Sequence, residues 1–418
     1  MERAIASKSL RILICGAGIT GPSLAYWLAR AGHRVVVFER FPALRATGAQ
    51  VDLRGQGIDA VQRMGLLDVI HSKRVDETGV ALVNAEGKAR ATLLANTSGQ
   101  GAQSLTSEYE IMRGDLVRIL YDATKDNVEY VFGKSVEHAE QDQDCVTAHF
   151  SDGSSAEFDL LIGADGQGSR VRNAMLPGGH SDPYLPMGIH MAYWFIPRIA
   201  SDGNIRDTYN ATGGRMIMRR SHNPTQTQVY FVLRETSPEA SAIHKEPVES
   251  QKQFWASKFR DAGWQARRFV DGMTTSGFFY SQEVVQVRMD SWSKGRVVLA
   301  GDAAHCASPF SGMGVSGALV GAYVLAGEIN RSSNNLPLAL ANYETALRPF
   351  VNEIQTVKSS LLHLAMPKTQ LGIEALHFGV GLACSLRIPQ LITKLSNKDR
   401  GGSWQLPEYA RSAMNLHH

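Results

Sequence analysis

A glycine pattern near the amino terminus constrains the fold of this chain more than any other feature. Residues 10–15 form an apolar run that is typical of a buried strand, and the run leads directly into Gly16-x-Gly18-x-x-Gly21. The spacing of apolar residues after this turn predicts a helix, and residues 35–38 follow as a second strand that ends at Glu39. In this order the glycines allow a tight turn, a close approach to a pyrophosphate and helix packing, while Glu39 accepts from a ribose hydroxyl. The pattern predicts a dinucleotide site, with an ordinary glycine-rich turn as the alternative.

Two later segments also end a strand at an acidic residue. Residues 157–162 predict a strand that runs into Gly163-Ala164-Asp165-Gly166, and Ser169 opens the helix that follows. Residues 295–300 predict another strand, which ends at Gly301-Asp302. Because open α/β sheets bind ligands at the carboxyl ends of their strands, Asp165 and Asp302 are candidate ligand contacts. A simple Asp-Gly turn is the alternative for Asp165.

The last of these strand ends is followed by an uncovered helix start. The pattern predicts a helix of small residues over 315–329, and this helix is preceded by Pro309, Gly312, Met313 and Gly314. The glycines leave the first amides of the helix bare, so its positive end faces whatever lies in front of it. A buried helix start is the alternative, although it would not require both glycines.

Composition excludes several classes of protein. The chain has 418 residues, 20% charged residues and a formal net charge of +3, without a basic block of the kind that binds nucleic acid. This length predicts two interlocked domains in a soluble globular enzyme. The four cysteines stand far apart and no histidines cluster in the sequence, which argues against a disulfide scaffold and a metal site. We therefore expect a reducing, cytoplasmic location and no metal.

The middle of the chain has a different sequence pattern from the segments on either side of it. This segment contains short runs with alternating or aromatic-rich patterns, and proline and glycine turns separate them. The pattern predicts an antiparallel sheet with one covered face. The other face is expected to form the wall of a cavity. Residues 80–83 and 91–94 predict a hairpin that belongs to the same domain. We therefore expect an α/β fold with three parts: a Rossmann-like domain over 8–75, 106–178 and 290–335, a sheet domain over 76–105 and 179–289, and a helical segment over 336–418.

The carboxyl-terminal part is expected to be helical. A long helix is predicted over 338–364, and the tail over 371–395 is apolar but interrupted by charged residues and Pro389. These interruptions argue against a membrane span. We expect an amphipathic pair that covers the cavity, with contact to a membrane surface as the less favoured alternative.

The three motifs together resemble the group A flavoprotein monooxygenases, the single-component FAD enzymes related to para-hydroxybenzoate hydroxylase. Within that group the chain is most similar to the flavin-dependent monooxygenases that degrade tetracyclines and to their fungal relatives, a match carried by residues 48–54, 65–67 and 113–116. The resemblance implies a glutathione-reductase-type FAD domain, non-covalent FAD and transient docking of NAD(P)H. It further implies that a flavin hydroperoxide inserts one atom of dioxygen into an aromatic or polycyclic substrate.

The resemblance also implies roles for individual residues. The glycine turn and Glu39 would hold the ADP half of FAD, Arg113 would lie along the flavin chain, and Asp302 would bind the ribityl hydroxyls. Asp165 belongs to a motif associated with both FAD and NAD(P)H, and the glycines before the last helix would face the pyrimidine edge of the ring. The full set of expected cofactor contacts is Gly16, Gly18, Gly21, Glu39, Arg40, Arg113, Asp165, Asp302, Pro309, Gly312, Met313 and Gly314.

Four residues are candidates for substrate contact. His190, Met191 and Trp194 lie on a predicted strand of the cavity wall, and Arg215 occupies a position similar to one that contacts substrate in the tetracycline-degrading relatives. A buried structural histidine is the favoured alternative for His190. A position away from the substrate is the alternative for Arg215.

Two other functions compete with a monooxygenase. Trp194-x-Ile196-Pro197 is half of the motif of flavin-dependent halogenases, although Ala192 stands where that motif has its first tryptophan. A flavoprotein that does not transfer oxygen, such as a reductase or a flavin-bound regulator, is the rival from another class. A monomer and a homodimer are both compatible with the sequence.

Overall fold

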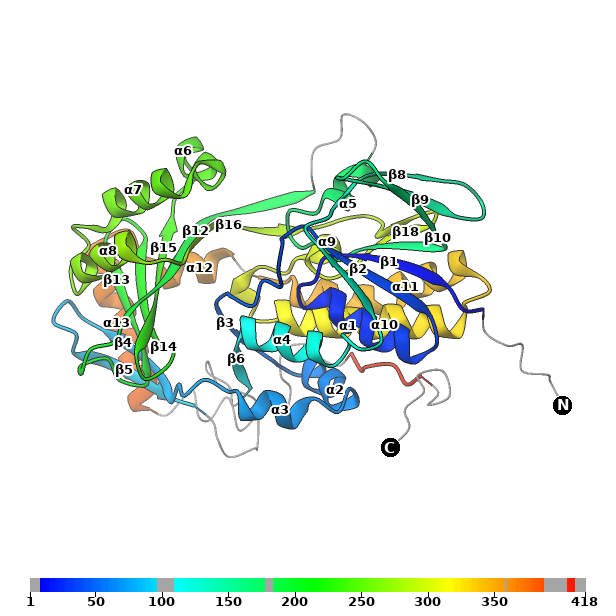
Figure 1. Ribbon diagram of the computed structural model, residues 1–418. Coiled ribbons are helices and arrows are strands. Elements are labelled where there is room, and N and C mark those ends of the chain that lie inside the picture. The colour runs from blue at the N-terminus through cyan, green and yellow to red at the C-terminus, as the bar shows by residue number, and fades with distance from the viewer. Residues whose placement is uncertain (1–7, 96–108, 177–182, 358, 387–403, 410–418) are drawn as a thin grey trace.

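A six-stranded sheet and a seven-stranded sheet organise the molecule (Figure 1). The computed structural model describes residues 8–95, 109–176, 183–357, 359–386 and 404–409. The long strands β12 (Tyr184–Pro197) and β16 (Phe279–Val287) extend between the two parts and pair with each other. The chain therefore leaves the first part for the second and returns to it, which confirms the expected interleaved α/β fold. The exact domain boundaries remain a prediction.

The six-stranded sheet has the order β17-β18-β11-β1-β2-β7. All its neighbours pair in parallel except β17 with β18, which is antiparallel. Its strands are β1 (Arg11–Cys15), β2 (Arg34–Glu39), β7 (Glu129–Phe132), β11 (Leu160–Gly163), β17 (Ser293–Lys294) and β18 (Val297–Leu299). The three motifs follow β1, β11 and β18, which are adjacent strands, so they meet at one edge of this sheet.

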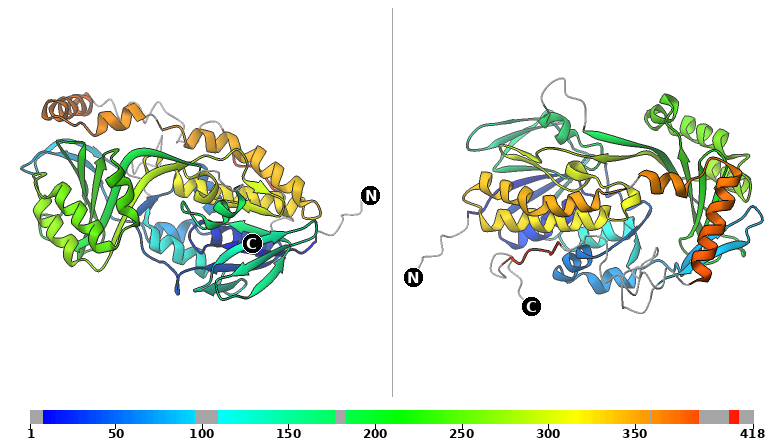
Figure 2. Two further views of the ribbon diagram at one scale, coloured as in Figure 1. Left: turned by 90° about the horizontal axis from the view of Figure 1, so that it is seen from above. Right: turned by 180° about the vertical axis from the view of Figure 1, so that it is seen from behind.

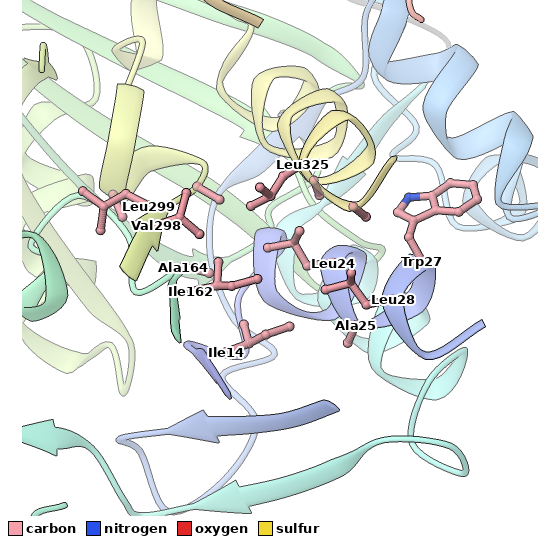
Figure 3. Packing of buried hydrophobic residues seen from close by; sticks show 14 of the residues in the cluster. Ile14, Leu24, Ala25, Trp27, Leu28, Ile162, Ala164, Val298, Leu299 and Leu325 are labelled. Carbon is pink, nitrogen blue, oxygen red and sulfur yellow. The ribbon is translucent and has the colours of Figure 1, made fainter. Parts of the chain in front are cut away.

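Helices cover one face of the six-stranded sheet, and a small sheet covers the other (Figure 1). The helical layer consists of α1 (Thr20–Arg30), α10 (Gly314–Arg331) and α11 (Leu336–Ile354), and the small sheet of β8 (Val136–Gln141), β9 (Val146–Phe150) and β10 (Ser155–Phe158). Figure 3 shows Leu24 and Leu28 of α1 and Leu325 of α10 in the core beside Ile14 and Ile162 of the sheet. Full burial of each such side chain contributes about 1.5–3 kcal/mol.

The seven-stranded sheet has the order β16-β12-β15-β14-β13-β4-β5. Its remaining strands are β4 (Gly79–Val83), β5 (Ala89–Leu94), β13 (Ile205–Ala211), β14 (Arg215–Ser221) and β15 (Gln226–Arg234). The predicted hairpin is present as β4 and β5, but β4 pairs with β13 in parallel. The strands of the middle segment all pair antiparallel, which confirms the predicted antiparallel sheet. The one parallel pairing arises because a hairpin from an earlier part of the chain docks onto the edge of this sheet.

The two faces of the seven-stranded sheet have different neighbours. Three helices cover the face away from the six-stranded sheet: α6 (Pro238–Ala242), α7 (Val248–Phe259) and α8 (Ala266–Thr275) (Figure 1). Ala192, Trp194 and Ile196 of β12 point into this helix-covered core, which we call the outer face. Because side chains alternate along a strand, Met191 and Tyr193 point to the opposite side, which we call the inner face. The inner face is directed at the six-stranded part.

Short elements connect the two parts. Strands β3 (Gln50–Asp52) and β6 (Glu110–Met112) pair beside the inner face, accompanied by α2 (Gln56–Arg63), α3 (Leu67–Ser72) and α4 (Arg113–Asp122). Two short helices follow strands of the six-stranded sheet: α5 (Arg170–Met175) follows β11, and α9 (Asp302–His305) follows β18. The predicted hairpin and the helix predicted over 315–329, which is observed as α10, agree with the sequence patterns.

The carboxyl-terminal helices differ from the prediction. Instead of one long helix over 338–364, α11 ends at Ile354, and α12 (Ser359–Ala365) and α13 (Gln370–Ser385) follow along the seven-stranded sheet (Figure 2). Gln355 accounts for the break, because its Nε2 donates to the carbonyls of Val287 at 2.8 Å and Cys306 at 3.1 Å. Its own carbonyl accepts from Gln286 at 2.8 Å, so the chain is fixed to the end of β16 and leaves the helical path.

The contact between α1 and the glycine turn generates a stability prediction. A Cβ on Gly21 would lie 1.9 Å from the carbonyl oxygen of Gly16, which is backbone and has no room to move. Gly21→Ala is therefore expected to lower the free energy of unfolding by at least about 1–3 kcal/mol, the range for overpacking. Urea unfolding followed by circular dichroism measures the change. Gly277→Ala is the control, since a Cβ there meets nothing within 4 Å, and equal stability of the two variants would contradict the packing role.

Candidate active site

The glycine turn has the geometry expected of a dinucleotide site. Gly16 has a φ of 111°, a conformation that favours glycine, and its amide donates to the carbonyl of Phe38 at 2.7 Å. A Cβ on Gly18 would have only the guanidinium of Arg113 nearby, at 3.5 Å. Gly21 is the position where helix and strand touch. The turn therefore combines one glycine needed for conformation, one with space beside it, and one needed for packing.

Glu39 closes the other side of this turn. Its carboxylate accepts from the amide of Ala17 at 2.9 Å and from the amide of Phe41 at 3.1 Å. Arg40 lies close by, with its guanidinium 4.9 Å from the centre of the Phe41 ring. Glu39 is thus fixed at the end of β2 beside the glycines, as the expected ribose contact requires, and Arg40 stacks on the neighbouring ring.

Arg113 links the glycine turn to the next loop. It is the first residue of α4, its backbone amide donates to Ala49 at 3.0 Å, and its Nη1 donates to the carbonyl of Thr47 at 3.0 Å. Burial lowers its pKa, which the nearby Tyr193 partly offsets. Arg113 therefore stands where the nucleotide turn, the loop over 45–49 and the inner face of the second sheet come together.

Asp165 serves a local structural purpose. Its carboxylate accepts from Ser169 Oγ at 2.5 Å and from the backbone amides of Arg170 at 2.8 Å and Val171 at 3.3 Å. These bonds satisfy the amides at the start of α5. They favour the turn and capping interpretation, and a ligand role for Asp165 stays a prediction.

The third motif places a carboxylate beside Arg113. Gly301 has a φ of 60°, and a Cβ there would lie 2.2 Å from Thr20 Oγ1, so α9 is held directly against α1. Asp302 begins α9, where burial raises the pKa of its carboxyl and the charge of Arg113 lowers it. The first and third motifs are therefore brought together in space.

The start of α10 combines strain with open space. Pro309 begins a short 3-10 turn after Ser308, a non-glycine residue with a φ of 78°, and Gly312 is left-handed with a φ of 66°. Such strain gathers at functional sites. A Cβ on Gly314 would meet nothing within 4 Å, which leaves the helix start accessible. Met313 is fully buried in the core, so only its backbone can reach a ligand.

The loop over 48–57 contributes residues that the sequence patterns did not single out. The backbone amide of Arg54 donates to Ser316 Oγ at 2.9 Å, and its side chain pairs with Asp52 at 2.5 Å. A Cβ on Gly312 would lie 3.9 Å from Arg54 Nε. Nothing in the spacing of this loop marked Arg54 as the cation beside the start of α10.

Three of the four substrate candidates lie on the outer face, and that part of the prediction is wrong. His190 contacts the carbonyl of Glu235 at 3.0 Å and His244 at 2.9 Å, and Trp194 Nε1 donates to Phe269 at 3.2 Å under the helices. Arg215 donates to Asp261 at 2.6 Å and to the carbonyl of Lys258 at 2.8 Å. All three were assigned without knowledge of strand register, and only Met191 points to the inner face.

The inner face is aromatic at its centre. The ring of Tyr193 lies 5.5 Å from that of Tyr230, 5.3 Å from that of Tyr280 and 5.7 Å from that of Phe278, centre to centre. Burial raises the pKa of all three tyrosines, so they stay neutral at physiological pH. The hydroxyl of Tyr230 accepts from the backbone amide of Gln50 at 3.3 Å, which joins this face to β3.

A buried charge cluster adjoins the aromatic rings. Arg220 of β14 donates to both oxygens of Glu77, at 3.0 and 2.9 Å, and also to Glu110 of β6. Burial raises the pKa of Glu110 to about 7 against the opposing effect of Arg220. The cluster therefore joins the sheet to the nucleotide-binding part through a carboxyl that titrates near neutral pH.

One group with metal-ligand chemistry emerged from strand pairing. Within the described ranges His138, Glu140 and His149 place one potential ligand atom each within 4.8 Å of one another, because β8 and β9 pair side by side. His138 and His149 are 11 positions apart in the sequence but lie close together in the folded protein. The expectation that histidines do not cluster is therefore wrong for the folded protein. Glu140 is 75% exposed, and its oxygen is 3.9 and 4.0 Å from the two rings.

The fold is that of a protein of two sheets in which the three motifs meet at one edge of the six-stranded sheet, at the ends of β1, β11 and β18. Residues 9–355 match the family described as "FAD binding domain". This chain belongs to that family, and it is an FAD-dependent monooxygenase by its similarity to full-length relatives.

Relatives match along nearly the whole chain. FAD-dependent monooxygenase asL4 of Sarocladium schorii is 36% identical, over 96% of this chain and 98% of its own length. Flavin-dependent monooxygenase eupH of Phoma sp is 37% identical, with the same shares covered. The crystal structure of tetracycline destructase Tet(51) superposes with a TM-score of 0.78 at 32% identity, covering 96% of this chain and 99% of that one. Separately, across the parts of the chain that the structure describes, helices long and apolar enough to cross a membrane are absent.

Asp302 generates a prediction about FAD binding. A carboxylate that accepts from ribityl hydroxyls makes charge-assisted hydrogen bonds worth about 1.5–3 kcal/mol each. Asp302→Ala is therefore expected to weaken FAD binding by about 10-fold or more. Equilibrium titration of the flavin-free protein with FAD measures the affinity. Asp261→Ala, on the outer face, is the control, and unchanged affinity in Asp302→Ala would remove Asp302 from the flavin ligands.

Proposed function

We propose that this protein uses NAD(P)H and dioxygen to insert one oxygen atom into a small aromatic or polycyclic molecule. The observation that carries the proposal is the meeting of the three nucleotide motifs with the aromatic inner face of the second sheet. The names of the full-length relatives and the tetracycline destructase similarity support oxygen insertion and a substrate with fused rings.

FAD, when bound, supplies hydride acceptance from NAD(P)H and activation of dioxygen. The residues present fit this cofactor, because Gly18 and Gly314 border space that a Cβ would enter, and Glu39 and Asp302 offer carboxylates at the end of β2 and the start of α9. We assign the ADP half to the glycine turn and Glu39. Arg113 and Asp302 are assigned to the chain that leads to the flavin ring.

The protein holds positive charge at the start of α10. The first amides of α10 and the guanidinium of Arg54 are both beside Gly312. A helix start stabilises an anion in front of it by about 0.3–2 kcal/mol, with the larger values in partly buried sites. We assign this end to the edge of the flavin ring that becomes anionic on reduction.

The inner face provides the substrate-binding wall. Tyr193, Tyr230 and Tyr280 offer ring faces for an aromatic substrate, and Met191 and Met218 add polarisable contacts. Few of these groups bind water strongly, so the wall keeps water from the reacting atoms while it orients the substrate.

The rival functions have weaker support. The half motif of the halogenases, Trp194 and Ile196, is buried under α8 on the outer face and has no access to a ligand. A reductase that transfers no oxygen accounts for the FAD groove but gives no role to an aromatic wall beside it.

Labelled dioxygen provides the decisive test. With purified protein, FAD, either NADPH or NADH and a panel of phenols and polycyclic polyketides, we expect a product heavier by one ¹⁸O atom when the gas is ¹⁸O₂. Consumption of NAD(P)H and formation of product should be stoichiometric. Mass spectrometry and absorbance measure both quantities.

Two results would contradict the proposal. Oxidation of NAD(P)H that yields only hydrogen peroxide across the panel would favour a reductase or oxidase. A chlorinated product in the presence of chloride would favour a halogenase.

The position of Arg215 on the outer face gives a separate prediction. It is the opposite of the result expected if Arg215 lay on the substrate-binding wall. Because its guanidinium is held by Asp261 and Lys258 on the outer face, Arg215→Ala is expected to leave the ratio of product to peroxide unchanged. Peroxide and product are measured together in the wild type and the variant. A clear shift toward peroxide would return Arg215 to the substrate site.

A further inference from the structure

The small sheet of β8, β9 and β10 has a covered side and a solvent side. Val146, Ala148 and Phe150 of β9 are buried on the covered side, in the core of the six-stranded part. Because side chains alternate along a strand, Thr147 and His149 between them point to the solvent side. Figure 1 shows this sheet on the outside of the molecule, so solutes can reach its solvent side.

A β-bulge in β8 directs His138 to the solvent side. Val136 pairs with Phe150, and the next pair is His138 with His149, so Glu137 is the extra residue of the bulge. In regular pairing Glu137 would lie opposite His149, and His138 would point to the covered side. Bulges re-aim side chains and are retained features of a fold. This bulge brings two imidazoles to directly opposite positions on adjacent strands.

Glu140 completes a compact group of potential metal ligands. It lies two positions after His138 and therefore on the same side of β8. His138, Glu140 and His149 offer one ligand atom each, and these three atoms lie within 4.8 Å of one another. The centres of the two imidazole rings are 4.1 Å apart, with 6° between the ring planes. Two rings and a carboxylate thus lie together at one point of the surface.

The polar atoms of this group are close without being hydrogen-bonded to one another. Oε1 of Glu140 is 3.9 Å from Nε2 of His138 and 4.0 Å from Nε2 of His149, which exceeds the length of a hydrogen bond. Nε2 of His149 is shielded from solvent and lacks a hydrogen-bond partner among the described residues. A shielded nitrogen in this state calls for a further group beside it, such as an ion.

The neighbouring side chains favour a cation. Glu140 is opposite Thr147, which is opposite Glu157 of β10, so a second carboxylate belongs to the same row. In the next row His149 is opposite Ser155. The described residues of these two rows include neither lysine nor arginine. The fixed charge of the rows is therefore negative.

We propose that His138, Glu140 and His149 bind one divalent transition-metal ion of the zinc type. The proposal is independent of the proposed function, because the site shares no residue with the flavin-binding motifs. Two imidazoles and one carboxylate are a zinc ligand set that keeps a position open for water, whereas calcium and magnesium take oxygen ligands.

The ion requires only small movements of exposed side chains. Zinc bonds of about 2.0–2.2 Å place tetrahedral ligands about 3.3–3.5 Å apart. The carboxylate has to approach each ring by about 0.5 Å, and the rings have to turn out of their parallel stack. The side chains of His138 and Glu140 are 59% and 75% exposed, so they are free to make these movements. The bound ion then ties β8 to β9.

Zinc titration of the FAD-loaded protein is the first test. The full chain is prepared without a histidine tag, treated with EDTA and desalted, and Zn²⁺ is titrated at pH 7.5 by isothermal calorimetry. We expect one zinc per chain with a Kd below about 100 μM. Weaker binding, or binding without a fixed stoichiometry, would overturn the proposal, because it shows adventitious zinc only.

Variants assign the ion to these residues. His138→Ala and His149→Ala are each expected to weaken zinc binding by more than 10-fold, because loss of even an outer partner of a metal ligand costs about 10–100-fold. His363→Ala, at an exposed histidine of α12, is the control and keeps the wild-type affinity. FAD content is expected to be the same in all variants. Wild-type zinc affinity in the variant that carries both His138→Ala and His149→Ala overturns the proposal.

Copper gives a spectroscopic readout on the wild-type protein. Imidazole ligands suit Cu²⁺, which binds a given site more tightly than Zn²⁺, and electron paramagnetic resonance detects nitrogen atoms bound to it. Oxidised FAD has no unpaired electron and does not interfere. We expect coupling to two nitrogens in the wild type and to one in His138→Ala. A wild-type spectrum without nitrogen coupling would contradict the assignment. Neither test requires turnover, so a failure of oxygen insertion is recognised separately in the labelled-dioxygen experiment.

Discussion

The position of Arg113 determines how the two parts of the protein form one site. Its guanidinium lies beside Gly18, donates to the carbonyl of Thr47 at 3.0 Å, and exerts its charge on Tyr193 and Asp302. A half-buried arginine with this many fixed contacts has little freedom to move. The glycine turn, the loop over 45–49 and the inner face are therefore held in register by a side chain that itself starts a helix.

The two faces of the seven-stranded sheet serve different purposes: the outer face stabilises the fold, and the inner face carries groups suited to ligand recognition. Its outer face is a conventional core in which Trp194, Phe231 and Phe259 pack under helices, and ion pairs such as Arg215 with Asp261 close its rim. Its inner face carries tyrosines, methionines and charged groups that a stability criterion alone would not select. Because alternate residues of one strand serve these two purposes, a shift of a single position changes the inferred role of a residue completely.

That sensitivity explains which parts of the site could be predicted. The glycine turn, Glu39, Asp302 and the start of α10 are marked by short motifs in which each residue type has a local conformational reason, and the structure brings them to one edge of a sheet. Substrate residues carry no such mark. His190 and Trp194 were chosen by residue type, whereas their role depends on the pairing of β12 with β15. Arg220 gains its meaning only from its contacts with Glu77 and Glu110, which are more than 100 positions away in the sequence.

The charge cluster around Arg220 has a consequence for specificity as well as for architecture. A buried ion pair is often no more stabilising than apolar side chains of the same volume, but removal of one partner costs about 3–5 kcal/mol. Arg220 with Glu77 and Glu110 therefore adds little net stability while it strongly penalises any other placement of β14 against β6. The same cluster keeps the neighbouring part of the inner face polar in an otherwise apolar wall.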